Sequence, residues 1–70
     1  MGRITESMAQ YGDYFKARLD NGGIRIGLRG CECFDFPPTC PEYGRVLQLE
    51  QSQIEAAHDE FMGKYIINHA

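Results

Sequence analysis

Apolar and polar residues alternate through residues 14–29, which is the most regular pattern in the chain. The apolar positions are Phe15, Ala17, Leu19, Ile24, Ile26 and Leu28. A period of two is typical of strands that bury one face. Asn21 and Gly22, between the two runs, are the preferred pair for a two-residue type I′ turn, because both central residues of that turn need positive φ. We therefore predict a β-hairpin over residues 14–29.

The predicted turn also decides which side chains share a face of the hairpin. With two residues at the tip, Leu19 faces Ile24, and the other apolar residues face one another in the same way. The opposite face then points to solvent and carries Tyr14, Lys16, Arg18, Arg25 and Arg29. Arg18 lies opposite Arg25 in this register, and like charges at such positions are destabilising. An acidic side chain of the same chain or an anionic partner would offset the repulsion, although exposed strands also carry cations for solubility alone.

A helix is the alternative interpretation of the N-terminal part. The spacing of Ile4, Met8, Tyr11, Phe15 and Leu19 also fits one helical face. Gly12 would lie inside that helix at a cost of about 1 kcal/mol relative to alanine. We favour the hairpin and expect residues 1–13 to add a short helix or an edge strand.

Two further elements are expected after the hairpin. Residues 43–49, YGRVLQL, are predicted as a third strand with Val46 pointing outward. A helix is predicted from about residue 52 to 67, because Ser52 and Glu55 have the spacing of a capping box. Its apolar stripe consists of Ile54, Ala57, His58, Phe61, Met62 and Tyr65.

These elements predict a small α+β fold. Residues 1–70 would form a single domain in which a small antiparallel sheet packs against one C-terminal helix. Ala56, Gly63 and Ile67 lie on the side of the helix away from the apolar stripe. An ordinary solvent-facing surface is the main expectation, and the alternative is that side chains of this size admit a second helix, as in a homodimer.

The composition is typical of a small intracellular protein. The chain has 70 residues, a net charge of −3 and three cysteines. An odd number of cysteines cannot all pair within one chain, and the sequence shows no signal-peptide pattern and no apolar run long enough to cross a membrane. We predict a cytoplasmic location and no membrane partner.

Residues 31–41, CECFDFPPTCP, contain the candidate chemistry. A Cys₃His zinc site would use Cys31, Cys33, Cys40 and His58. The Cys-x-Cys spacing differs from the common Cys-x-x-Cys knuckle, and His58 falls in the apolar helix stripe. Zinc is therefore an alternative, and the main expectation is no cofactor. Glu32 and Asp35 disfavour thiolates, which argues against a redox role.

The same segment is predicted to be a rigid connector. Pro37, Pro38 and Pro41 restrict φ and remove three hydrogen-bond donors. Phe34 and Phe36 are expected to place one ring in the core and one at the surface, where it would contact a partner.

No motif identifies a family, a catalytic site or a nucleotide site, and we predict that the protein is not an enzyme. The main hypothesis is a small intracellular regulator or inhibitor, of the kind that phages and mobile elements often encode. It would bind another protein through the cationic hairpin face and the Phe/Pro loop. The alternatives are a nucleic-acid-binding protein that uses the same basic face and a zinc-stapled adaptor.

Overall fold

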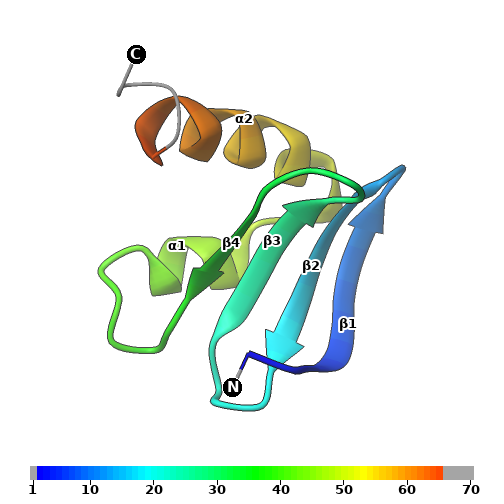
Figure 1. The fold of residues 1–70 in the computed structure, drawn as a ribbon. Helices are drawn as coiled ribbons and strands as arrows, with labels where there is room; N and C mark the ends of the chain where they lie inside the picture. Colours follow the sequence, from blue (N-terminus) through cyan, green and yellow to red (C-terminus); the bar gives the residue numbers. More distant parts are fainter. Residues whose placement is uncertain (1, 66–70) are drawn as a thin grey trace.

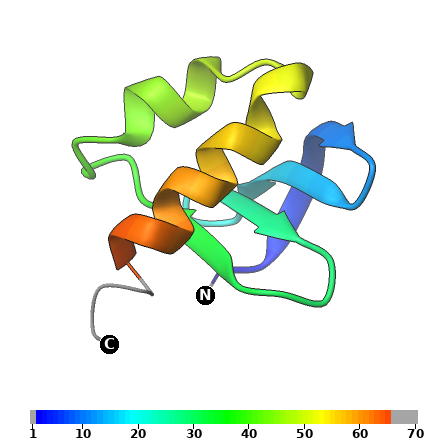
Figure 2. The same cartoon turned by 90° about the horizontal axis from the view of Figure 1, so that it is seen from above.

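The computed structural model describes residues 2–65, and it contains one four-stranded antiparallel sheet with both helices on the same face (Figure 1, Figure 2). The strands are β1 (Ile4–Tyr11), β2 (Tyr14–Leu19), β3 (Ile24–Leu28) and β4 (Cys33–Phe36), and they lie side by side in chain order. They are followed by α1 (Tyr43–Gln48), the short 3₁₀ helix η1 (Gln51–Gln53) and α2 (Ile54–Tyr65). The predicted α+β class is confirmed.

The hairpin at Asn21 and Gly22 is confirmed, but its turn is one residue longer than predicted. The Leu19 N–H donates to the Gly23 carbonyl at 2.9 Å, and the Gly22 N–H donates to the Leu19 carbonyl at 3.0 Å. Three residues, 20–22, therefore form the loop. Only Gly22 takes a positive φ, 86°, whereas a type I′ turn would also require positive φ at Asn21. The loop is thus a type I turn followed by a glycine bulge.

This extra residue shifts the register between β2 and β3 by one position. Lys16 now faces Ile26, Arg18 faces Ile24, and Ala17 faces Arg25. A shift of one residue moves a whole set of side chains to the other face of a sheet. We call the side covered by α1 and α2 the helix face and the other side the open face. The expectation that all five polar residues share a solvent face is wrong.

Residues 4–11 form an edge strand, so the strand alternative for the N-terminal segment is confirmed and the single helix through Leu19 is wrong. The pairing of β1 with β2 is irregular at two places, between Ile4 and Glu6 and between Ser7 and Ala9. Gly12, which argued against the helix, lies in the turn after β1 with φ 61°. β-Bulges such as the two irregular positions in β1 increase strand twist and make an edge less suitable for pairing with another strand.

The core lies between the helix face of the sheet and the two helices. It consists of Ile24, Ile26, Phe34, Phe36, Val46, Ile54, Ala57 and Phe61. Burial of one such large apolar side chain stabilises the fold by about 1.5–3 kcal/mol. Phe34 and Phe36 belong to β4, where residues two apart share a face, so both rings are buried. The expected surface phenylalanine in a loop is therefore wrong.

The predicted third strand at residues 43–49 is also wrong, because most of this segment is α1. Val46 was expected to point outward and is instead fully buried. Tyr43 and Leu49 pack against the same core. The spacing of 43, 46 and 49 is three residues each time, which matches one side of a helix better than one face of a strand.

The C-terminal helix is confirmed, with different limits. α2 begins at Ile54 after η1 and is described to Tyr65; residues 66 and 67 of the prediction lie outside the described part. The predicted stripe is largely correct, with Ile54, Ala57, His58 and Phe61 buried, Met62 partly buried and Tyr65 46% exposed. The capping box is formed by Glu50 and Gln53 instead of Ser52 and Glu55, because a 3₁₀ turn precedes α2.

Candidate protein-binding edge

Lys16 lies inside the molecule and is not a surface contact residue. Only 4% of the residue is exposed. Its Nζ donates to the carbonyl oxygens of Val46, Leu47 and Leu49 at 3.3, 2.9 and 2.6 Å. These carbonyls belong to the C-terminal end of α1, where the last backbone acceptors of a helix lack the usual partner, although the Val46 carbonyl also accepts from the Leu49 N–H at 3.2 Å. Burial lowers the pKa of Lys16, and the charge of Arg18 lowers it further.

Arg18 and Arg25 lie on opposite faces of the sheet, and each has its own partners. The Arg18 guanidinium donates to the Gly22 carbonyl at 3.1 Å and to the Tyr43 hydroxyl at 2.9 Å on the helix face. On the open face, Arg25 donates to both carboxylate oxygens of Asp35, at 2.6 and 2.8 Å. This pair raises the pKa of Arg25. The predicted repulsion between Arg18 and Arg25 therefore does not exist.

The two remaining residues of the predicted cationic face do not form a patch with these arginines. Arg29 is exposed after the end of β3. Tyr14 is half buried, and its ring meets the His58 ring edge-on with centroids 5.6 Å apart. Partial burial raises the pKa of Tyr14, and the nearby carboxylates of Glu55 and Asp59 raise it further. The basic face on which the nucleic-acid hypothesis depended is not formed by the described residues.

The candidate zinc ligands are spread over different environments. Cys31 and Cys33 are exposed, Cys40 is partly buried, and all three are free thiols. His58 is buried, and its Nε2 lies 2.8 Å from the carbonyl oxygen of Glu32. Within residues 2–65, no three His, Cys, Asp or Glu side chains are grouped so that they could hold a metal ion. Burial raises the pKa of the Cys33 thiol, although Arg25 acts in the opposite direction.

The outer surface of α2 is compatible with both the expected solvent-facing surface and the homodimer alternative. Ala56 and Gly63 are exposed, and Ile67 lies outside the described residues.

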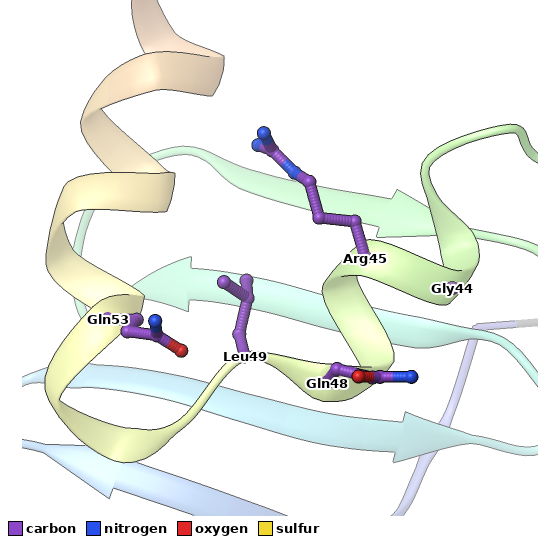
Figure 3. Close-up of a pocket in the computed structure, with 5 residues that line it drawn as sticks. All are labelled: Gly44, Arg45, Gln48, Leu49 and Gln53. Atoms are coloured by element: carbon purple, nitrogen blue, oxygen red, sulfur yellow. The ribbon is translucent and has the colours of Figure 1, made fainter.

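A hollow of about 490 Å³ lies between α1 and the start of α2, but its charged group already has partners. The hollow is lined by Gly44, Arg45, Gln48, Leu49 and Gln53 (Figure 3). Arg45 forms ion pairs with Glu60 at 2.9 Å and with Glu42 at 3.4 Å, and its guanidinium lies over the Phe61 ring. Any anion in this hollow would have to compete with two carboxylates. The arrangement therefore links the two helices and offers little to a ligand.

The outer edge of β4 is a better candidate for a binding site. In the described part of the chain, β4 pairs only with β3 and forms the end of the sheet (Figure 1). A hollow of about 380 Å³ lies beside it, lined by Cys33, Phe34, Asp35, Phe36, Cys40 and Tyr65. Most of this lining is aromatic rings and thiols, which suits apolar side chains. We call this hollow the β4 groove.

The hydrogen-bond pattern of the sheet shows which backbone groups of β4 point outward. In an antiparallel sheet, successive residues of a strand direct their N–H and C=O groups to opposite sides. The Gly23 carbonyl accepts from Leu19 on β2, so Gly23 points toward β2. Ile24 and Ile26 therefore direct their N–H and C=O groups to the opposite side, toward β4. They pair there with Phe36 and Phe34. The backbone groups of Cys33 and Asp35 therefore point away from the sheet, beside the β4 groove.

The other edge of the sheet is less suited to pairing. β1 has two irregular positions in its ladder, and η1 packs against it. β4 shows a regular register with β3 over all four residues. Interrupted edges resist the addition of another strand, whereas regular ones permit it. The sequence signal for this edge is the period-two pair Phe34 and Phe36, and the prolines that follow favour a loop and so obscure the strand.

Comparisons with protein-family models, with curated proteins and with solved structures gave no significant match. Among residues 2–65, no helix has the length and apolar character needed to cross a membrane.

Proposed function

We propose that this protein is a small binding module, acting as a regulator or inhibitor, that holds an extended segment of another protein along the outer edge of β4. The observation that carries the proposal is the position of the Cys33 and Asp35 backbone groups beside the β4 groove. Strand addition to an exposed sheet edge is a general mode of peptide recognition. Backbone hydrogen bonds give affinity in this mode, and pockets for alternate side chains give specificity.

The edge can supply enough interactions for a measurable complex. Cys33 and Asp35 together offer two N–H donors and two carbonyl acceptors to a neighbouring strand. A typical hydrogen bond contributes about 0.5–1.5 kcal/mol net. The groove beside them adds burial of apolar surface at about 25 cal/mol per Å². We therefore expect dissociation constants in the micromolar range or weaker for short peptides.

We further propose that the protein acts in the cytoplasm. All three cysteines are free thiols in the structure, and Cys31 and Cys33 are exposed. Exposed free thiols are compatible with a reducing compartment and are liable to oxidation elsewhere.

The decisive experiment compares Asp35→Pro with Asp35→Ala. Both variants lose the ion pair with Arg25, but only proline also removes the outward N–H. Asp35 does not use this N–H to bond to β3, so proline is tolerated there as on other edge strands. Peptides selected from a random linear library against the natural protein serve as probes, and binding is followed by ¹⁵N–¹H NMR titration.

We expect the peptides to shift the Cys33 and Asp35 amide signals and to protect these amides from hydrogen exchange. Asp35→Ala and Asp35→Pro lose the Asp35 charge alike, so Asp35→Ala should still bind, and a further loss of binding in Asp35→Pro, with its fold intact by circular dichroism, measures the outward N–H. If Asp35→Pro does not fold, Cys33→Pro against Cys33→Ala tests the other outward N–H. Equal binding by the proline and alanine variants, or shifts confined to another surface, would overturn the proposal. A concentration-dependent dimer in ultracentrifugation that uses the same edge would identify a second copy as the occupant instead.

A further inference from the structure

The open face presents a row of side chains that ends in a carboxylate. Ala17, Arg25 and Asp35 lie side by side across β2, β3 and β4. A strand added to β4 would place its own residue next to Asp35. Neighbouring strands are about 4.8 Å apart, so Arg25 would be one strand farther from the ligand than Asp35 is. The charge nearest to that ligand residue is therefore negative.

Asp35 retains the capacity to bind a second cation. Its side chain is 45% exposed, compared with 26% for Arg25. Each carboxylate oxygen accepts one hydrogen bond from Arg25, and a carboxylate has about four acceptor positions in all. Glu32, which is exposed just before β4, adds negative charge at this edge. A basic ligand side chain would extend the alternation of charge from Arg25 through Asp35.

The helix face presents an apolar row at the neighbouring position. Ile26 and Phe34 lie side by side on β3 and β4. The Phe34 ring packs 6.0 Å from the Tyr65 ring, which is 46% exposed at the margin of the β4 groove. Since side chains of a strand alternate between faces, the ligand residue next to the basic one would enter this groove.

We infer that the β4 edge selects an extended segment in which a lysine or arginine faces Asp35 and the next residue is apolar and fills the β4 groove. This inference rests on the proposed strand addition and names its partner chemistry. In the antiparallel arrangement, which continues the pattern of the sheet, the third residue faces Cys33. Gly27 lies on the far side of Cys33, about two strand spacings away, and does not constrain this position. The recognised segment is then a basic residue followed by an apolar one.

Synthetic heptapeptides with blocked ends and the centre Lys-Leu-Ala provide the test. Three relatives carry Glu in place of Lys, Ser in place of Leu, or N-methyl groups on the two amides that would bond to β4. Affinities for the natural protein are measured by NMR titration at low ionic strength. We expect the Glu peptide to bind about tenfold more weakly, because opposite charges on adjacent strands attract and like charges repel. The Ser peptide should also lose about tenfold, through lost apolar burial.

An isosteric protein variant shows whether Asp35 is responsible. In Asp35→Asn the preference for Lys over Glu should disappear or reverse, because Arg25 then becomes the nearest charge. The preference for Leu over Ser should remain. The inference is overturned if the Lys and Glu peptides bind equally well, or if no peptide of the set binds at millimolar concentration. Should charge have no effect while N-methylation still abolishes binding, strand addition stands and only the inferred selectivity fails. Binding that survives N-methylation would instead refute the proposed function.

Discussion

The Nζ atom of Lys16 on β2 donates a 2.6 Å hydrogen bond to the carbonyl oxygen of Leu49, which follows the end of α1. Two more carbonyls of the same helix end accept from this ammonium group. A cation at a helix C-terminus is favourable because the helix dipole places partial negative charge there. One side chain of the sheet thus holds a six-residue helix that is too short to be stable alone.

Replacing Lys16 should therefore disrupt α1. Lys16→Met keeps most of the aliphatic volume but removes the ammonium donor from three carbonyl groups, of which, within residues 2–65, only that of Val46 retains another donor, the Leu49 N–H. Unsatisfied buried polar groups cost about 1–3 kcal/mol each, and water will reach some of these, so we expect a total loss of about 3 kcal/mol. Urea denaturation followed by circular dichroism measures the loss. Lys64→Met is the matched control, because its ion pair with Glu42 is exposed and such pairs contribute little to stability. Equal stability of the two variants would contradict the role assigned to Lys16.

Glycine substitutions test the turn that sets the register. Gly22 has φ 86°, which disfavours any residue with a Cβ, and a Cβ there would lie 3.5 Å from Pro38. Gly22→Ala should lower stability by about 1 kcal/mol. Gly44→Ala should instead raise it by up to about 1 kcal/mol, since Gly44 lies in α1 with open space around its Cα. Thermal unfolding of both variants is the measurement, and a stabilising Gly22→Ala would show that the turn differs from the structure.

The same turn explains which parts of the fold could be predicted from the sequence. Alternation and the Asn21-Gly22 pair were sufficient for the existence of the hairpin. They did not distinguish a two-residue loop from a three-residue loop, because a glycine at position 22 suits either loop. That single residue decides the face of Lys16 and Arg18. The burial of Lys16 and the partial burial of Arg18 became visible only once α1 supplied acceptors from at least 25 residues away in the sequence.

The predictions for β4 and α1 were wrong for local reasons. The two phenylalanines of β4 had the correct period of two, but the following prolines suggested a loop. α1 has six residues, which is fewer than two helical turns. A segment this short does not repeat its three-residue spacing often enough to be distinguished from a strand pattern. The candidate site depends on β4, and it could not be predicted before the strand itself was recognised.

Tyr14 gives the protein a pH dependence in the alkaline range. Its pKa is raised in the folded state, first by partial burial and then by Glu55 and Asp59. Between the unfolded pKa, about 10, and the higher folded pKa, the folded state binds more protons than the unfolded state. Stability contributed by Tyr14 is thus complete below the unfolded pKa and is lost as pH rises through the folded pKa.

Tyr14→Phe should accordingly lose less stability than the natural protein as the pH rises above about 10. Urea denaturation at several pH values measures the difference. Lys16, whose lowered pKa acts on stability in the opposite direction, is present in both proteins and does not affect the comparison. Tyr11→Phe controls for the removal of an exposed hydroxyl. Parallel pH profiles for the natural protein and Tyr14→Phe would contradict the assigned environment of Tyr14.

Phe36 and Tyr65 both line the β4 groove, but they should respond differently to substitution. Phe36 is 3% exposed and its ring centroid is 4.8 Å from that of Phe61. Phe36→Ala should therefore destabilise the fold by about 3–5 kcal/mol. Tyr65 is 46% exposed at the end of α2, so Tyr65→Ala should change stability by less than about 1 kcal/mol.

Tyr65→Ala should nevertheless weaken binding of the Lys-Leu-Ala heptapeptide by about fivefold, because the apolar ligand residue loses one wall of its groove. NMR titration of a folded variant measures this directly. Exposed Leu47 on α1 provides the control, since Leu47 does not line the β4 groove and Leu47→Ala should leave the affinity unchanged. If both variants bind as the natural protein does, the groove takes no part in recognition, and any affinity of the edge comes from backbone hydrogen bonds alone.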